Sequence, residues 1–126
     1  MNAKHVIAWV LCVVLGLFFI GGAGFSKLSP SDEILENFEA FGYPPWFVTF
    51  TGILEVLGGL LLLIPALASY GGLIIAGVMA GAVYSHVASG IGSPALAAVF
   101  LVLAVICCYL RLDRAFGPLG SLGGRR

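Results

Sequence analysis

WFVTFTGILEVLGGLLLLIP, residues 46–65, is long enough and apolar enough to decide the fold of this chain. About 20 apolar residues at a rise of 1.5 Å per residue span the roughly 30 Å hydrocarbon core of a bilayer, so we predict a membrane-spanning helix here. One carboxylate, Glu55, lies in the middle of the segment. A charge at that depth costs about 2.5–3.5 kcal/mol or more. We therefore expect Glu55 to be ion-paired, protonated or turned toward a polar cavity.

The residues around Glu55 indicate which face of this helix meets other helices. Gly52, Glu55 and Gly59 follow one another at spacings of three and four, which places them on one helical face. Glycines on such a face let a second helix approach closely. We predict that residues 46–65 form the inner helix of a small bundle and that Glu55 points at its neighbours.

The composition favours lipid rather than water as the surroundings of most of the chain. Charged residues make up 10% of the sequence and hydrophobic residues 60%, whereas soluble domains carry about 25% charged residues. The length of 126 residues fits a single domain. The formal net charge is zero, and the few basic residues form no patch with interleaved aromatic residues, which argues against nucleic-acid binding.

The cysteines give no sign of a metal or thiol-redox centre in the sequence. Cys12, Cys107 and Cys108 all lie in apolar runs, form no C-x-x-C pair and have no histidine at a ligand spacing. We interpret them as small apolar packing residues and expect no metal site and no intrinsic cofactor. Because Cys107 and Cys108 are adjacent, they would point to different faces of a helix.

Hydropathy predicts an all-α fold, an integral membrane four-helix bundle with a short amphipathic helix between the first two spans. The expected spans cover about residues 5–24, 46–65, 70–89 and 95–110. Lys4 and the apolar run after it would also suit a signal peptide, although that run is long for one. Residues 1–114 would form one membrane domain, and the Gly-rich residues 115–126 a flexible tail.

The amphipathic helix is expected in the polar insert, residues 29–41. Ser29 and Pro30 suit the N-cap and the first helical position, and Asp32 and Glu33 suit the first turn, where the helix dipole favours acids. Apolar residues then recur at helical spacing with acidic residues on the other side, so this helix would lie on the membrane surface or cap the bundle.

The charge distribution predicts the orientation in the membrane. With four spans, both termini lie on one side, which carries Lys4, Arg111, Arg114, Arg125 and Arg126. The other side carries only Lys27 among basic residues. The positive-inside rule therefore places both termini in the cytoplasm and the insert outside.

The polar residues of the predicted spans gather in the outer half of the bundle. Lys27, Thr51, Glu55 and His86 could line an outward-opening polar pocket. Alternatively, Glu55 could be a buried structural tie that accepts hydrogen bonds from a neighbouring helix, while Lys27 extends to the surface. The sequence leaves both readings open. His86 has no second ligand at i+3 or i+4, so it does not indicate a metal site.

Glycines at four-residue spacing mark the faces expected to pack against other helices. Gly52, Gly59, Gly77 and Gly81 are the candidates for this packing role, within the chain or between copies. The alternative is that they make room for a flat ligand ring or a lipid tail.

Several of these motifs together resemble the DoxX-like membrane proteins. The similar stretches are residues 16–28, which end in Lys27 and Leu28; Gly52, Glu55, Gly59 and Pro65; and Met79, Ala82 and His86. His5 stands nearest to the arginine or histidine common early in the family's first span. The resemblance implies a four-helix protein of the bacterial cytoplasmic membrane. Members of the DoxX-like family include quinone-linked oxidoreductase subunits, partners of redox-defence enzymes and, more distantly, membrane-protein chaperones or cargo receptors.

Two functional hypotheses follow, and neither establishes whether the chain is an enzyme. In the first, a small membrane subunit of a redox system binds a quinone or another lipid-like ligand. Glu55 would then exchange a proton, His86 would hydrogen-bond the ligand and Lys27 would set the local charge. In the second, the chain is a scaffold, chaperone or assembly factor that contacts copies of itself or other membrane or redox subunits. A transporter subunit has less support, because no internal repeat is visible.

Overall fold

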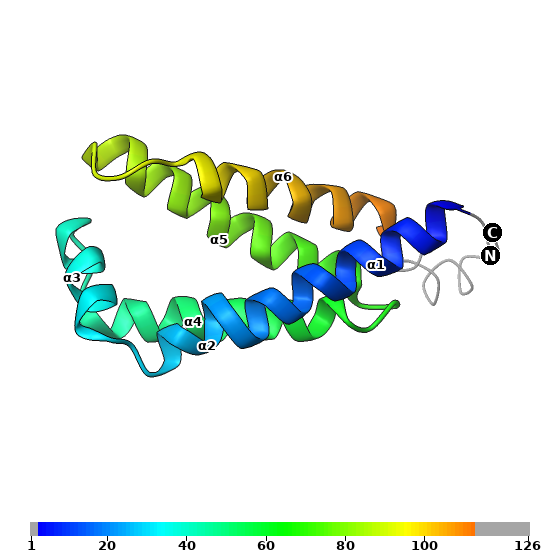
Figure 1. Ribbon diagram of the computed structural model, residues 1–126, viewed down its shortest axis with the longest axis horizontal. Coiled ribbons are helices and arrows are strands. Elements are labelled where there is room, and N and C mark those ends of the chain that lie inside the picture. Colours follow the sequence, from blue (N-terminus) through cyan, green and yellow to red (C-terminus); the bar gives the residue numbers. More distant parts are fainter. Residues whose placement is uncertain (1–2, 113–126) are drawn as a thin grey trace, which may run out of the picture.

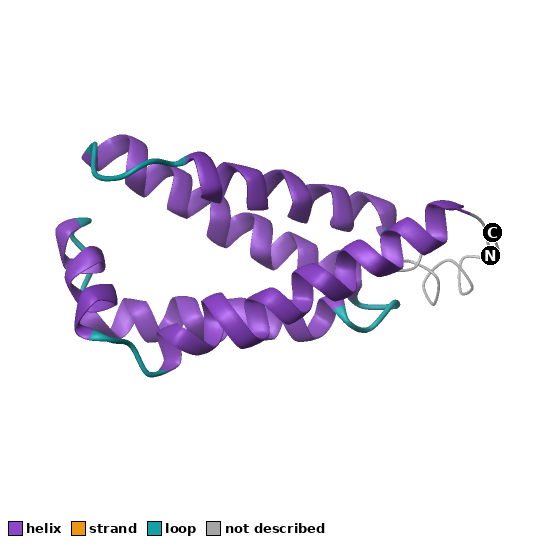
Figure 2. Ribbon diagram, viewed as in Figure 1, coloured by secondary structure: helices purple, strands orange, loops and turns teal. Residues whose placement is uncertain are grey.

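The computed structural model describes residues 3–112, and this part of the chain is all-helical. Figures 1 and 2 show its helices, which are α1 (Ala3–Phe18), η1 (Phe19–Gly24), α2 (Phe25–Leu28), α3 (Asp32–Ala40), α4 (Pro45–Leu62), α5 (Ala68–Ser89) and α6 (Ala95–Leu110). The predicted all-α fold is therefore confirmed. The predicted tail, residues 115–126, and the basic residues Arg114, Arg125 and Arg126 lie outside the described residues.

The first three elements form one continuous rod, Ala3–Leu28. The rod extends past the predicted boundary at Gly24 because nothing breaks it before Ser29, the residue that precedes Pro30 and leaves helical geometry at φ −132° and ψ 73°. Its middle part, η1, is a π-helix, a wider turn that often occurs at functional sites. The extension makes Lys27 part of the first helix.

The long helices run alternately up and down the molecule. In Figure 1 the rod lies beside α4, and α5 lies beside α6, so that α1 begins and α6 ends at the same end of the bundle. The short helix α3 crosses the opposite end, where α5 passes into α6 through residues 90–94. The two helical pairs diverge toward α3 (Figure 1).

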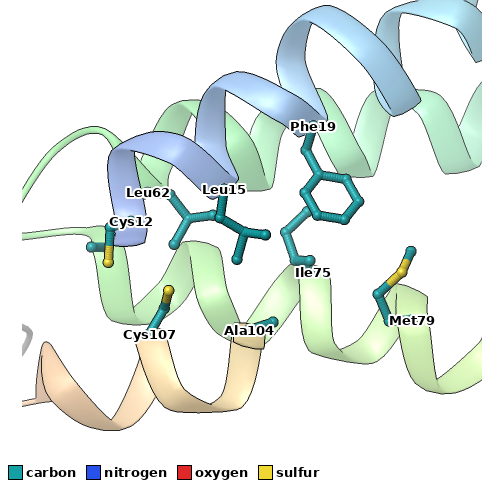
Figure 3. Packing of buried hydrophobic residues seen from close by; sticks show 9 residues of the cluster. Cys12, Leu15, Phe19, Leu62, Ile75, Met79, Ala104 and Cys107 are labelled. Carbon is teal, nitrogen blue, oxygen red and sulfur yellow. The ribbon is translucent and has the colours of Figure 1, made fainter. Parts of the chain in front are cut away.

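The core lies between the rod, α4, α5 and α6, and the outside is apolar as well. Leu15, Phe19, Leu62 and Ile75 are almost completely buried in it (Figure 3). Large apolar side chains on the outer helix faces are exposed, among them Trp9, Val14, Leu73, Leu96 and Val102. An apolar exterior of this extent fits lipid contact.

Three helices in the described part of the chain are long and apolar enough to cross a membrane, namely Ala3–Leu28, Pro45–Leu62 and Ala68–Ser89. The fourth apolar helix, α6, has 16 residues and a length of about 24 Å, which is short of the roughly 30 Å of hydrocarbon. The predicted spans 46–65 and 70–89 lie within three residues of the observed α4 and α5, while 95–110 coincides with α6. Pro65 follows the last turn of α4 rather than closing the helix itself.

The rod and α4 approach each other at glycines. A Cβ on Gly16 would lie 2.7 Å from the carbonyl oxygen of Gly59, and a Cβ on Gly59 would lie 2.8 Å from that of Gly16. Farther along, a Cβ on Gly52 would lie 2.9 Å from the carbonyl oxygen of Gly24. Only glycine permits backbones this close, so these positions set the distance between the two helices.

The start of α3 corrects one detail of the sequence prediction. The N-cap is Ser31, not Ser29, because the hydroxyl of Ser31 accepts a hydrogen bond from the Ile34 amide at 3.3 Å. Asp32 and Glu33 occupy the first turn, as predicted. Ser29 and Pro30 instead belong to the connection between the rod and α3.

Candidate functional site

A cavity of about 560 Å³ lies at the α3 end of the bundle, between α2, α3, α4 and α5. Helices α3 and α4 contribute aromatic walls, and α5 contributes small and aliphatic side chains. The four predicted site residues Lys27, Thr51, Glu55 and His86 all line it. The cavity therefore brings together residues from three separate segments of the chain.

Glu55 is ion-paired with Lys27 in the lining of this cavity. The Lys27 Nζ donates to Glu55 Oε1 at 2.9 Å and to the Ala23 carbonyl oxygen at 3.1 Å. Glu55 is 1% exposed, whereas the Lys27 side chain is 19% exposed. Of the three states that the sequence allowed for this carboxylate, the structure shows the paired one. Within residues 3–112, Lys27 is the sole hydrogen-bond donor that reaches the carboxylate, so Oε2 is available to another group.

Thr51 lies one turn from Glu55 on α4, and its hydroxyl has only part of its hydrogen-bonding capacity left for a ligand. Its hydroxyl donates to the Phe47 carbonyl oxygen of the same helix at 2.8 Å. The proton of the hydroxyl is therefore already used, and only its oxygen could accept a hydrogen bond from a ligand.

His86 lies near the end of α5 with one ring nitrogen already engaged. Its Nδ1 is 2.7 Å from the Ile91 carbonyl oxygen, which can only accept, so Nδ1 carries the proton in this contact. In a neutral ring, Nε2 is then an acceptor. The ring of Phe41 packs edge-on against the imidazole at a centroid distance of 5.0 Å. The loop also fits closely, because a Cβ on Gly92 would lie 3.2 Å from the ring.

Tyr43 and Ser85 are part of the site, although the sequence prediction did not include them. Tyr43 Oη lies 2.6 Å from Ser85 Oγ, and Ser85 Oγ donates to the Gly81 carbonyl oxygen at 2.9 Å. Since the serine hydroxyl has one proton, Tyr43 is the donor in this pair. The bond ties the segment after α3 to α5 across the cavity. In the sequence, Ser85 follows Gly77 and Gly81 at the same four-residue spacing. This spacing was the pattern from which its place in the site could have been predicted.

The glycines predicted for helix packing divide into two groups. Gly52 and Gly59 lie at the close approaches to the rod. Gly77 and Gly81 instead line the cavity, and no atom of the described residues lies within 4 Å of a Cβ placed on either one. Gly77 and Gly81 therefore do not pack against another helix within the described chain. Packing between copies and room for a ligand ring or a lipid tail both stay predictions for these two positions.

The chemistry available in this cavity is hydrogen bonding and proton exchange. In the described part of the chain, no three or more His, Cys, Asp or Glu side chains converge as metal ligands would. His5, the residue suggested by the resemblance, lies in the first turns of α1, at the other end of the bundle (Figure 1). The fold and the cavity thus define a small helical membrane protein with a ligand-sized, mostly apolar pocket that contains one ion pair.

Comparison with known proteins identifies the family of this membrane protein. A profile described as the DoxX-like family matches residues 10–108, and the chain belongs to that family. An uncharacterized protein, YdgD of Bacillus subtilis (strain 168), is 33% identical over 85 residues, which cover 64% of this chain and 74% of the relative. No solved structure matches the chain significantly.

Proposed function

We propose that this protein binds a quinone or another lipid-like molecule with a polar ring in the cavity between α3, α4 and α5, and that it serves a membrane redox system. The observation that carries the proposal is the position of the Lys27–Glu55 pair in the lining of an apolar cavity of about 560 Å³. This volume falls within the roughly 300–1,000 Å³ typical of small-molecule sites.

The lining of the cavity suits a flat polar ring on an apolar tail. Phe38, Phe47 and Phe50 offer aromatic surfaces, and Gly77 and Gly81 leave room on the opposite wall. The apolar surroundings favour the tail, while the few polar groups would orient the ring. We propose that Glu55 Oε2 accepts the proton of a ring hydroxyl or donates a proton to a ring carbonyl, and that Lys27 balances the charge. His86 would hydrogen-bond the ligand closer to the mouth of the cavity.

A bound quinone would supply the electron-transfer chemistry. The chain's own part in the proposal is to exclude water with its aromatic wall, to orient the ring and to hold a proton at Glu55. A partner subunit that supplies electrons would copurify with the protein.

The proposed orientation is that of a four-span protein of the bacterial cytoplasmic membrane with cytoplasmic termini. It is supported by Lys4 and Arg111 at one end of the bundle and by the position of α3 at the other. The short α6 would cross with local thinning of the bilayer. A reporter active only in the cytoplasm, fused to the C-terminus, should be active. An inactive fusion of full length would reverse the orientation.

Ligand binding is tested with purified protein in lipid nanodiscs. Native mass spectrometry would first identify any molecule that copurifies, and a short-tailed quinone would then be titrated against Glu55→Gln and wild type. The glutamine keeps an oxygen that accepts from Lys27 but cannot exchange a proton, so we expect the fold to persist and quinone affinity to fall about tenfold or more, which is 1.4 kcal/mol.

Glu33→Gln is the matched control, because Glu33 is an exposed residue of α3 that does not line the cavity. It should bind the quinone as wild type does. Equal affinity of wild type and Glu55→Gln would overturn the role of Glu55, and absence of quinone binding by wild type would overturn the ligand class. A stoichiometric partner protein that copurifies without any small molecule would favour the scaffold hypothesis.

A further inference from the structure

A second cluster of reactive groups lies between α1 and α6, near the end of the bundle opposite to α3. Cys12 of α1 is 2% exposed and Cys107 of α6 is fully buried. Figure 3 shows their sulfur atoms pointing toward each other across the helix interface. The two thiols thus face each other, although the residues lie near opposite ends of the sequence.

Arg111 makes this cluster more than apolar packing. Arg111 follows the last residue of α6, is 3% exposed, and lies close enough for its positive charge to act on both thiols. Within residues 3–112, its buried Nε has no hydrogen-bond partner. A buried cationic group with an unpaired donor is costly, and a thiolate would be a suitable counter-ion. A positive charge beside a cysteine also favours the thiolate, which is the nucleophilic form.

We infer that Cys12 and Cys107 form a redox-sensitive dithiol that hydrogen peroxide converts into a disulfide linking α1 to α6. In the first step, the Cys12 sulfur attacks the peroxide oxygen, the O–O bond breaks and water leaves after proton transfer, which yields a sulfenic acid on Cys12. In the second step, the Cys107 sulfur attacks the Cys12 sulfur, and a second water leaves as the S–S bond forms. Two thiols are oxidised, and one peroxide is reduced to two waters.

Cys108 provides an internal control for this inference. It is adjacent to Cys107, yet its thiol lies 3.3 Å from the hydroxyl of Ser69 on α5, away from Cys12. A sulfur in that position should not enter the disulfide. The inference concerns the opposite end of the bundle from the ligand cavity and stands whether or not a quinone binds there.

The experiment counts thiols in the full-length protein in isolated membranes. The membranes are treated with hydrogen peroxide and quenched with acid, and the denatured protein is reacted with a maleimide mass tag. Wild type should take up three tags before oxidation and one afterwards, whereas Cys108→Ser should take up two tags before and none after. Reduction before tagging should restore the original numbers.

Substitution of Cys12 alone shows which sulfurs pair. Cys12→Ser should keep both of its tags after peroxide treatment, because Cys107 has lost its partner. Arg111→Met should slow the loss of tags about tenfold or more, and Arg111→Lys should be closer to wild type, since the thiolate is the attacking species.

Three results would overturn the inference. Wild type could retain three tags at peroxide concentrations that oxidise an exposed cysteine in a reference protein. Cys12→Ser could lose both tags, which would show pairing of Cys107 with Cys108. The Arg111→Met variant could react as fast as wild type, which would remove the proposed role of the guanidinium.

Discussion

Lys27 and Glu55 join the first helical rod to α4 through an ion pair of 2.9 Å in the lining of the cavity. The rod presents Lys27 there because η1 and α2 continue the helix beyond Gly24. The same ammonium group also donates to the carbonyl oxygen of Ala23 in η1, so two acceptors hold it. The pair thus satisfies the buried carboxylate and leaves its second oxygen open to the cavity.

Replacing Lys27 by an uncharged residue should show how strongly an unpaired buried carboxylate destabilises the fold. We expect Lys27→Met to lower the free energy of unfolding by about 3–5 kcal/mol, because Glu55 would stay buried without its partner. The double variant Lys27→Met/Glu55→Leu should regain much of that loss, because no charge remains. Reversible unfolding in mixed detergent micelles measures both effects. Equal losses in the single and double variants would show that the unpaired carboxylate is not the cause of the destabilisation.

The two kinds of glycine should respond differently to one added methyl group. Gly59→Ala would place a Cβ 2.8 Å from the Gly16 carbonyl oxygen, so we expect a destabilisation of about 1–3 kcal/mol by overpacking. Gly81→Ala meets nothing within 4 Å and should gain up to about 1 kcal/mol from helix propensity. Thermal unfolding of both variants under one condition is the measurement, and a large loss in Gly81→Ala would contradict the open space around it.

The open position also allows the cavity to be filled without disturbing the core. Gly81→Leu should fold like wild type while it occupies part of the space that a ligand ring would need. We therefore expect quinone affinity to fall about tenfold or more, which corresponds to 1.4 kcal/mol. The titration used for Glu55→Gln applies here as well. Unchanged affinity in a folded Gly81→Leu protein would place the ligand elsewhere.

Sequence patterns predicted the helices well because hydropathy reports directly on the surrounding lipid. The long apolar runs fixed the positions of α4, α5 and α6 to within three residues. The depth of Glu55 indicated an inward-facing carboxylate, and the structure buries it. The first helix was predicted too short because its last turn, FSKL, is not purely apolar. Helical geometry there depends on the absence of a breaker before Ser29, not on hydropathy.

The remaining features depend on contacts between distant segments, which periodicity cannot reveal. Gly59 and Gly81 look alike in the sequence, yet only Gly59 faces a helix that lies close enough to touch it. Tyr43 could be placed at the membrane interface from its neighbours, but its bond to Ser85 requires α3 to fold over the end of α5. Likewise, nothing in the spacing of Cys12 and Cys107 indicates that they face each other.

Two serines are candidates for the N-cap of α3. The sequence predicted Ser29, whereas Ser31 occupies this position in the structure. Ser31→Ala should remove the hydrogen bond to the Ile34 amide and destabilise α3 by about 1 kcal/mol, whereas Ser29→Ala should have little effect. Amide hydrogen exchange in the first turn of α3 measures the difference. Faster exchange in Ser29→Ala than in Ser31→Ala would return the cap to Ser29.

The hydrogen bond between Tyr43 and Ser85 should control access to the cavity, because it ties the segment after α3 to α5. Tyr43→Phe removes the donor and keeps the ring that packs against Phe47 at a centroid distance of 4.6 Å. We expect a loss of about 0.5–1.5 kcal/mol from this contact, seen as faster amide exchange confined to α3 and the residues that follow it. Ser85→Ala should reproduce the effect, and Ser89→Ala is the matched control because Ser89 bonds only within its own helix end and the following loop.

Ligand association and dissociation should both accelerate in Tyr43→Phe, since opening at this place no longer breaks the bond. Unchanged exchange in α3 together with unchanged ligand kinetics would show that the aromatic packing alone holds this end of the cavity.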